Sequence, residues 1–458
     1  MSARKVAAGV LLRVWEQESY AAAALSAALG RSDLAARDRG LCTEIVYGVL
    51  RTQGHLERSI EQFGKLKRSD GFLRAQLLVA AYQIAFLDRV PARAAVCDAV
   101  DLISARRGAR VGGFANALLR ALAQECADKR PQLCDAIVSS TPSWIRKRLE
   151  RDVGKPHARA LLCPADRGAP ADRSSFRLFL RLLCSPSEIP WLATDCSPCE
   201  PIPGAFAFLA PGDPRARPEY AAGKFVVQEL GAQIVGHALG AQKGERVLDV
   251  CAGRGQKSTL LGQRVGSEGR VVACDVHEHK LSALREEAER LGLAIETLQI
   301  DWTQPVPSAL LDHFDRVLVD APCSGLGTLR RRPEIARRLQ ANDPQRLSQL
   351  QVAIATQAAS TLRPGGTLLF CTCSVLREEG EQSVEKLIAA TDLEPVAYGT
   401  VEKELLAYQP SSTLAEAPVL QAQSVGAAGS VPLPGAARLL PPIQGTDGYF
   451  LQLLQRPL

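Results

Sequence analysis

Apolar residues recur every three or four positions through the first part of the chain, which is the spacing of helices that bury one face. The pattern runs from Val6 to about Ala127 and is plain at Leu77, Leu78 and Ala81. Turn or cap residues interrupt it at 30–33, 54, 69–71 and 89–91. We therefore predict an all-α domain over residues 1–135.

From Gly244 onward the pattern changes to short apolar runs that alternate with helical stretches. Strands are predicted near 246–250, 270–274, 294–300, 316–319 and 367–372, with the plainest helices at 278–293 and 344–362. This alternation builds a parallel sheet with crossover helices. We predict a Rossmann-like α/β domain over 226–458, closed by a strand at 448–454 that suits a sheet edge or a hairpin.

In the middle of the chain, 136–225, residues 163–223 are rich in Pro, Gly and Cys and carry short apolar runs at 176–183 and 205–209. We predict a small α+β subdomain there. Cys196 and Cys199 have metal-ligand spacing, but no second pair or His cluster lies nearby, so we expect no metal site. Residues 410–437 hold one charged residue in twenty-eight and are predicted to be a flexible insertion.

Composition points to a soluble cytosolic protein, which we expect to be monomeric. No apolar run approaches the ~18 residues of a membrane span, and the N-terminus lacks the pattern of a signal peptide. Thirteen cysteines without a framework indicate reduced thiols. Residues 1–150 carry 23 Lys and Arg against 15 Asp and Glu, whereas the remainder carries 32 against 34. This asymmetry indicates a polyanion partner such as RNA.

A glycine-rich loop follows the first strand of the α/β part and opens a helix. Its residues are Cys251, Ala252, Gly253, Arg254, Gly255, Gln256 and Lys257. Glycines let a ligand approach the backbone, and a helix N-terminus offers unpaired N–H groups. Asp275 ends the next strand, where a carboxylate accepts both hydroxyls of a ribose, and Asp301 ends the third, near an adenine edge. A nucleoside cofactor fits. Ser258 stands where a dinucleotide loop needs its third glycine, which favours S-adenosylmethionine over a dinucleotide.

Two further strand ends carry thiols. Asp320-Ala-Pro-Cys-Ser-Gly325 ends one apolar run, and Cys371-Thr-Cys-Ser374 ends another. A thiolate adds to carbon 6 of a cytosine or uracil and makes carbon 5 nucleophilic enough to take a methyl group. Asp320 is placed to hydrogen-bond the pyrimidine edge. Cys251, Cys274 and Cys371 suit small buried apolar side chains instead, which leaves Cys323 and Cys373 as the candidate reactive thiols.

Five arginines fall between Arg330 and Arg338, directly after the first thiol stretch. A solvated basic loop is one interpretation. A phosphate clamp beside a pyrimidine-modifying site is the other, because guanidinium groups pair with phosphate in a bidentate way.

Taken together, these motifs resemble the Nol/Nop/Sun family of RNA cytosine-5 methyltransferases. The resemblance rests on 320–325 with 372–374, and extends to Asp249-Val-Cys-Ala252, Phe225-Val-Val-Gln-Glu229, Arg331-Arg-Pro-Glu-Ile335 and Asp447-Gly-Tyr-Phe450. The N-terminal helices resemble the NusB-type RNA-binding domain of the bacterial Sun branch. The residues that carry this second resemblance are 36–41, 47–51 and 114–120.

The resemblance implies a class I methyltransferase core that binds S-adenosylmethionine through residues 251–257, Asp275, Asp301 and Asp320. It implies Cys373 as the nucleophile and Cys323 as the group that assists product release. The implied substrate is a cytosine of small-subunit ribosomal RNA. Two departures stand out: the family's Ala-Pro-Gly-Gly-Lys loop reads Gly253-Arg-Gly-Gln-Lys257, and its Leu-Arg-x-Asn strand reads Leu180-Arg-Leu-Leu183.

Two other functions stay open at this stage. A noncatalytic RNA-binding or assembly protein would use the basic N-terminal helices and keep the α/β part as a relic, in which case the folded protein would not bind S-adenosylmethionine. A small-molecule methyltransferase would leave the N-terminal domain without a task.

Overall fold

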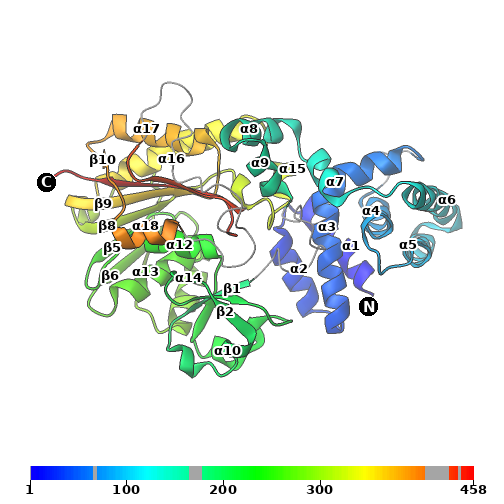
Figure 1. Ribbon diagram of the computed structural model, residues 1–458, viewed down its shortest axis with the longest axis horizontal. Helices are drawn as coiled ribbons and strands as arrows, with labels where there is room; N and C mark the ends of the chain where they lie inside the picture. The colour runs from blue at the N-terminus through cyan, green and yellow to red at the C-terminus, as the bar shows by residue number, and fades with distance from the viewer. Residues whose placement is uncertain (1, 65–69, 164–177, 408–432, 442–444) are drawn as a thin grey trace. The chain divides into compact units, whose positions relative to one another are not determined.

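Figure 1 shows the computed structural model of the chain, which describes residues 2–64, 70–163, 178–407, 433–441 and 445–458. The described residues form two compact units. The first contains the described part of Met1–Lys147 together with Leu329–Leu339, and the second contains the rest. Within these ranges, no helix is both long and apolar enough to cross a membrane.

The first unit begins with the helices that the apolar spacing predicted. They are α1 to α7, at Ala3–Glu16, Ala21–Gly30, Ala36–Glu61, Gly71–Phe86, Ala92–Arg107, Ala109–Asp128 and Leu133–Ser140. Leu11, Ile45 and Leu78, from three of these helices, are fully buried in one cluster. The unit therefore has a hydrophobic core of its own.

The predicted break at Gly54 is wrong, because α3 continues through it to Glu61. A Cβ atom on Gly54 would lie 3.1 Å from the Cα atom of Ser140, at the end of α7. The glycine thus allows α7 to lie close to α3, and it does not end the helix.

The arginine-rich segment belongs to this helical unit. Its helix α15 spans Ile335–Arg338. Arg337 pairs with Glu57 at 2.7 Å, and Arg338 donates to the carbonyl of Ser19 at 2.6 Å. The Glu334 carboxylate accepts the backbone N–H of Ala21 at 3.1 Å. Arg337 and Arg338 therefore make contacts inside the unit, and Arg337 remains exposed to solvent while it does so.

A small antiparallel sheet occupies the start of the second unit, after α8 (Ser143–Val153) and α9 (Lys155–Leu162). Its strand order is β2-β3-β1-β4, with bounds Cys196–Pro198, Ala205–Phe208, Leu178–Leu182 and Phe225–Val227. β1 and β3 correspond to the two predicted apolar runs, of which residues 176 and 177 lie outside the described residues. Short helices α10 (Leu192–Asp195) and α11 (Pro218–Ala221) accompany the sheet.

The large sheet has the order β10-β12-β9-β8-β5-β6-β7, and β11 also pairs with β12. The bounds of β5 to β12 are Arg246–Asp249, Arg270–Asp275, Glu296–Gln299, Phe314–Asp320, Leu362–Thr372, Glu394–Pro395, Ala436–Leu439 and Tyr449–Gln455. β5 to β9 pair in parallel, as predicted, whereas β12 runs antiparallel to β9. Of the two alternatives expected for the last strand, the sheet edge is wrong, because β10 and β11 pair with its other side. The hairpin is confirmed, because β11 and β12 are consecutive and antiparallel.

Helices cover both faces of this sheet (Figure 1). α12 (Leu230–Ala238), α13 (Gln256–Val265) and α18 (Thr400–Leu406) share one buried cluster with the sheet, which includes Leu369. α16 (Asp343–Ala359) and α17 (Glu381–Ala390) share the other, which includes Phe370. α14 (Glu278–Arg290) packs through Leu284 on Ala273. Successive residues of β9 thus point to opposite helical layers, as the pleat of a strand requires.

Two sequence expectations need correction. Eleven of the described cysteines are free, as expected, but Cys134 and Cys163 are each disulfide-bonded. Of the predicted flexible insertion, 410–432 lies outside the described residues, but Ala436 and Ala437 pair in register with β12 as part of β11.

Candidate active site

The strand order places a switch point between β5 and β8. β6 and β7 extend the sheet on one side of β5, whereas β8 and β9 extend it on the other. Loops that leave neighbouring parallel strands in opposite directions open a crevice at the carboxyl ends of those strands. β5 ends at Asp249, β8 at Asp320 and β9 at Thr372. The predicted chemical groups therefore arrive at one edge of the sheet.

The loop after β5 carries two glycines in conformations that side chains disfavour. Gly255 is the N-cap of α13 with φ 81°, and a Cβ atom there would lie 2.5 Å from Cγ of Leu284. Gly253 has φ 58°, and its missing Cβ atom faces open space. Packing against Leu284 thus requires a glycine at position 255, whereas Gly253 leaves its backbone open to a ligand.

Buried Asp249, at the end of β5, binds the first turn of the helix that follows the glycine loop. Its carboxylate accepts the hydroxyl of Ser258 at 2.7 Å. Burial raises the pKa of Asp249 to about 7, although the Ser258 hydrogen bond acts to lower it. Asp249 therefore titrates near neutral pH.

Asp275 and Asp301 lie in different environments. Asp275 is 7% exposed, and its carboxylate accepts the N–H of Gly253 at 3.1 Å and that of His277 at 2.9 Å. Asp301 is exposed, and the side-chain and backbone hydrogen bonds from Thr303 lower its pKa. The structure thus ties Asp275 to the glycine loop, whereas Asp301 is oriented by its own turn.

The two candidate thiols converge, as their strand ends predicted. β8 and β9 pair in parallel with Asp320 opposite Cys371, so the segments beyond them leave the sheet together. The Sγ atoms of Cys323 and Cys373 are 3.3 Å apart. The hydrogen bond with Cys373 and burial raise the pKa of Cys323 well above its usual range. Cys323 therefore keeps its proton at neutral pH, and Cys373 can act as the acceptor sulfur of the pair.

A buried carboxylate, that of Glu379, binds both of the segments that carry the cysteines. Glu379 lies in the short helix Arg377–Glu379, and its carboxylate accepts the N–H and the hydroxyl of Ser324. It also accepts the hydroxyl of Ser374 at 2.6 Å. Ser324 follows Cys323 and Ser374 follows Cys373, so Glu379 fixes both thiols relative to each other.

Backbone hydrogen bonds also hold the two cysteine segments close together. The N–H of Gly327 donates to the carbonyl of Cys373 at 3.0 Å, and the N–H of Gly448 donates to Gly327 at 2.8 Å. A Cβ atom on Gly327 would lie 2.0 Å from the Gly448 carbonyl oxygen. Only glycine fits at position 327, where the Cys323 segment meets both β9 and the start of β12.

Lys257 brings a positive charge to the thiols. Its ammonium is 2.5 Å from the Asp320 carboxylate and 5.9 Å from the centre of the Tyr449 ring. Burial acts to lower the pKa of Lys257, but Asp320 and the nearby sulfurs of Cys371 and Cys373 raise it. The amine is therefore charged at neutral pH. A fixed ammonium of this kind favours a thiolate over a thiol at a neighbouring cysteine.

Sequence reasoning named most of these groups but missed two relationships. Lys257 was predicted only as part of the cofactor loop, and Glu379 was not predicted at all, because nothing in the sequence distinguishes it from its neighbour Glu378. Glu378 instead pairs with Arg148 at 3.3 Å. Arg181, in the segment compared with Leu-Arg-x-Asn, is 1% exposed and bonds to Gln228 at 2.8 Å, so its side chain contributes to the interior.

Comparisons with known proteins match both parts of the chain. The family model described as 16S rRNA methyltransferase RsmB/F matches residues 236–455, and the NusB family model matches residues 1–124. The chain is 32% identical over 403 residues to ribosomal RNA small subunit methyltransferase B of Vibrio cholerae, covering 85% of this chain and 90% of the relative. It is 28% identical over 471 residues to the probable enzyme of that name in Bacillus subtilis, covering 98% of each.

Solved structures share the fold. PH0851 has a TM-score of 0.79 with 24% identity and covers 100% of this chain and 99% of its own. NSun6 from Pyrococcus horikoshii with SFG has a TM-score of 0.55 with 15% identity, covering 69% of this chain and 98% of its own.

Proposed function

The chain belongs to the ribosomal RNA small subunit methyltransferase B family, and on this premise we propose that it methylates carbon 5 of a cytosine in 16S ribosomal RNA through a covalent bond to Cys373. Its N-terminal unit is a NusB-type domain, and its cofactor is S-adenosylmethionine. We propose that it acts as a monomer in the cytoplasm.

The glycine loop and Asp275 suit this cofactor. The open space at Gly253 leaves room for a ligand beside the backbone, and the Asp275 carboxylate lies against the same residue. We propose that residues 251–257, Asp275, Asp301 and Asp320 hold the cofactor, with Asp275 accepting the ribose hydroxyls. S-adenosylmethionine supplies an electrophilic methyl group.

The observation that carries the proposal is the 3.3 Å thiol pair beside the Lys257 ammonium. Cys373, as a thiolate, attacks carbon 6 of the cytosine and makes carbon 5 nucleophilic. Carbon 5 takes the methyl group, and loss of its proton then expels Cys373 and restores the aromatic ring. Asp320 hydrogen-bonds the pyrimidine edge during the addition. Cys323, beside Cys373, assists release by assisting loss of the carbon-5 proton, which passes to solvent.

The product of the reaction tests the proposal. The full chain is incubated with radiolabelled S-adenosylmethionine and small-subunit ribosomal RNA, and the RNA is digested to nucleosides. We expect label in 5-methylcytidine, and none when Cys373 is replaced in Cys373→Ala. Label in a ribose-methylated or N4-methylated nucleoside, or full turnover by Cys373→Ala, would overturn it. A folded chain that does not bind S-adenosylmethionine would instead indicate a noncatalytic RNA-binding protein.

A further inference from the structure

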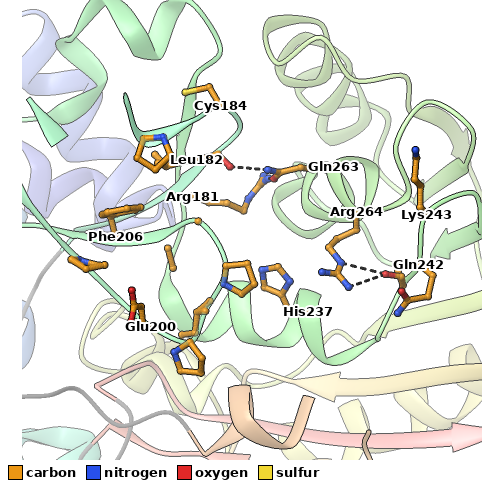
Figure 2. Close-up of a pocket in the computed structure, with 18 residues that line it drawn as sticks. Arg181, Leu182, Cys184, Glu200, Phe206, His237, Gln242, Lys243, Gln263 and Arg264 are labelled. Carbon is orange, nitrogen blue, oxygen red and sulfur yellow. Dashed lines mark hydrogen bonds between the residues drawn. The ribbon is translucent and has the colours of Figure 1, made fainter. Parts of the chain in front are cut away.

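A cavity of about 880 Å³ lies between the small sheet and helices α12 and α13 of the second unit (Figure 2). Its size is within the range of about 300–1,000 Å³ that is usual for small-ligand pockets. The cavity is lined on one side by residues of β1 and β3, such as Leu182 and Phe206, and on the other by His237, Gln263 and Arg264.

This cavity is separate from the candidate active site. The lining residues Gln263 and Arg264 are in the last turn of α13, whereas Lys257 of the active site is in its first turn. Lys257 and Gln263 are six positions apart in the helix, which corresponds to about 9 Å along the axis. Gln242 and Lys243 of the cavity precede β5, whose other end carries the glycine loop. The two sites thus lie at opposite ends of β5 and α13.

The lining is positively charged. The lining residues include three cations, Arg181, Lys243 and Arg264, and one carboxylate, Glu200. Arg181 is buried and donates to Gln228 and Gln263 and, at 2.9 Å, to Thr259, which are neutral partners. Arg264 donates to the Ala241 carbonyl at 3.1 Å, and Lys243 meets exposed Glu268 at 4.0 Å. A partly enclosed space with this excess of positive charge favours an anion.

His237 gives the cavity a second feature of a binding site. Its side chain lies among the lining residues in Figure 2 and is 6% exposed. Among the described residues, neither of its ring nitrogens has a hydrogen-bond partner. Burial, followed by the charges of Arg264 and Arg181, lowers its pKa to about 4. The neutral ring thus offers one hydrogen-bond donor and one acceptor. Leaving such groups without partners in a buried place costs free energy, so a ligand that bonds to them would be stabilised.

We propose that this cavity binds a nucleotide through its phosphate and ring. Arg264 and Lys243 pair with the phosphate, His237 hydrogen-bonds a hydroxyl or base nitrogen, and the apolar wall at Phe206 contacts the ring. The nucleotide is either free in solution or part of an RNA strand. The inference goes beyond the proposed function and needs neither the thiols nor methyl transfer.

The test measures binding of cytidine monophosphate and of an unstructured ten-nucleotide RNA to the full chain in the Cys373→Ala background. Arg264→Gln combined with Lys243→Gln removes both charges. Arg270→Gln is the matched control, because Arg270 pairs with Glu296 and does not line the cavity. Loss of charged hydrogen bonds should weaken binding at least about ten-fold in the double variant and leave the control unchanged. Thermal unfolding verifies that each variant is folded.

Histidine-labelled protein gives a site-specific readout, with the His237 signals assigned by His237→Gln. Shifts of these signals on adding cytidine monophosphate, lost in the double variant, identify a free nucleotide as ligand. Shifts with the RNA alone identify a nucleotide of the strand. If neither ligand moves the His237 signals, or if the double variant binds both as tightly as the control, the proposal is wrong. Failure here leaves the formation of 5-methylcytidine untouched, so the two proposals fail separately.

Discussion

The Sγ atoms of Cys323 and Cys373 lie 3.3 Å apart although fifty residues separate them in the chain. Burial and the hydrogen bond with Cys373 raise the pKa of Cys323 well above its usual range, and the proposed mechanism makes Cys373 the attacking sulfur. These different roles predict different outcomes for Cys323→Ala and Cys373→Ala.

Cys323→Ala should accumulate a covalent protein–RNA complex, because Cys373 still adds to the cytosine while product release is impaired. A shifted band on a denaturing gel, dependent on S-adenosylmethionine, measures it. Cys373→Ala and the double variant are the controls and should form no complex. A complex in Cys373→Ala would reverse the two roles.

Glu379→Ala should reduce methyl transfer at least ten-fold and lower stability by about 1–3 kcal/mol, since it leaves the Ser324 N–H buried without its partner. Denaturant unfolding and single-turnover rates measure the two effects. The matched control is Glu378→Ala, which removes a partly exposed partner of Arg148 and should change the rate little. Equal rates for both variants would remove Glu379 from its positioning role, whereas partial rescue by Glu379→Gln would support it.

Lys257→Met should slow alkylation of Cys373 by iodoacetamide at pH 7 about ten-fold, because the ammonium that favours the thiolate is gone. Peptide mass spectrometry after timed labelling follows this one cysteine. Lys280→Met serves as the control, since Lys280 pairs with Asp275 at 3.3 Å. An unchanged rate in Lys257→Met would mean that another group stabilises the thiolate.

Asp275→Asn should weaken S-adenosylmethionine binding about ten-fold or more, as expected for loss of a charged hydrogen-bond acceptor that the Gly253 loop holds in place. Asp301→Asn should have a smaller effect, because Asp301 is exposed and bonded to Thr303. Titration calorimetry compares the two. A larger loss in Asp301→Asn would contradict the assignment of the ribose to Asp275.

Asp249 should make the protein less stable as pH rises. Its pKa is raised from 3.8 to about 7 in the folded state, so between these values the folded chain holds a proton that the unfolded chain has lost. The stabilisation is fully present below pH 3.8 and is lost as pH rises through about 7, at about 1.4 kcal/mol per pKa unit. Urea unfolding at pH 5 and pH 8 should show a larger decrease for the wild type than for Asp249→Asn. An identical decrease would show that Asp249 is ionised throughout.

The sequence alone determined the helical N-terminal part, the parallel order of the strands and the groups at their ends. It could do so because periodicity reports which face of a segment is buried, and because parallel strands deliver their carboxyl ends to one edge. The meeting of Cys323 with Cys373 follows from that rule. The family resemblance added the division of labour between them, which remains a prediction.

Only the tertiary structure decided which partners these groups have. Lys257 and Asp320 are separated by 63 residues, and Glu379 and Ser324 by 55, so no local pattern couples them. Gly54 suggests a helix break in the sequence, yet α3 continues through it. The missing side chain leaves room for Ser140 of α7 instead. Arg337 is exposed, as a basic segment suggests, but only the structure shows that it pairs with Glu57. The sequence shows which positions are charged, and hydrophobic spacing indicates which are buried. The contacts of each side chain depend on segments far apart in the chain, which only the tertiary structure brings together. These contacts set the charge and geometry around the thiols.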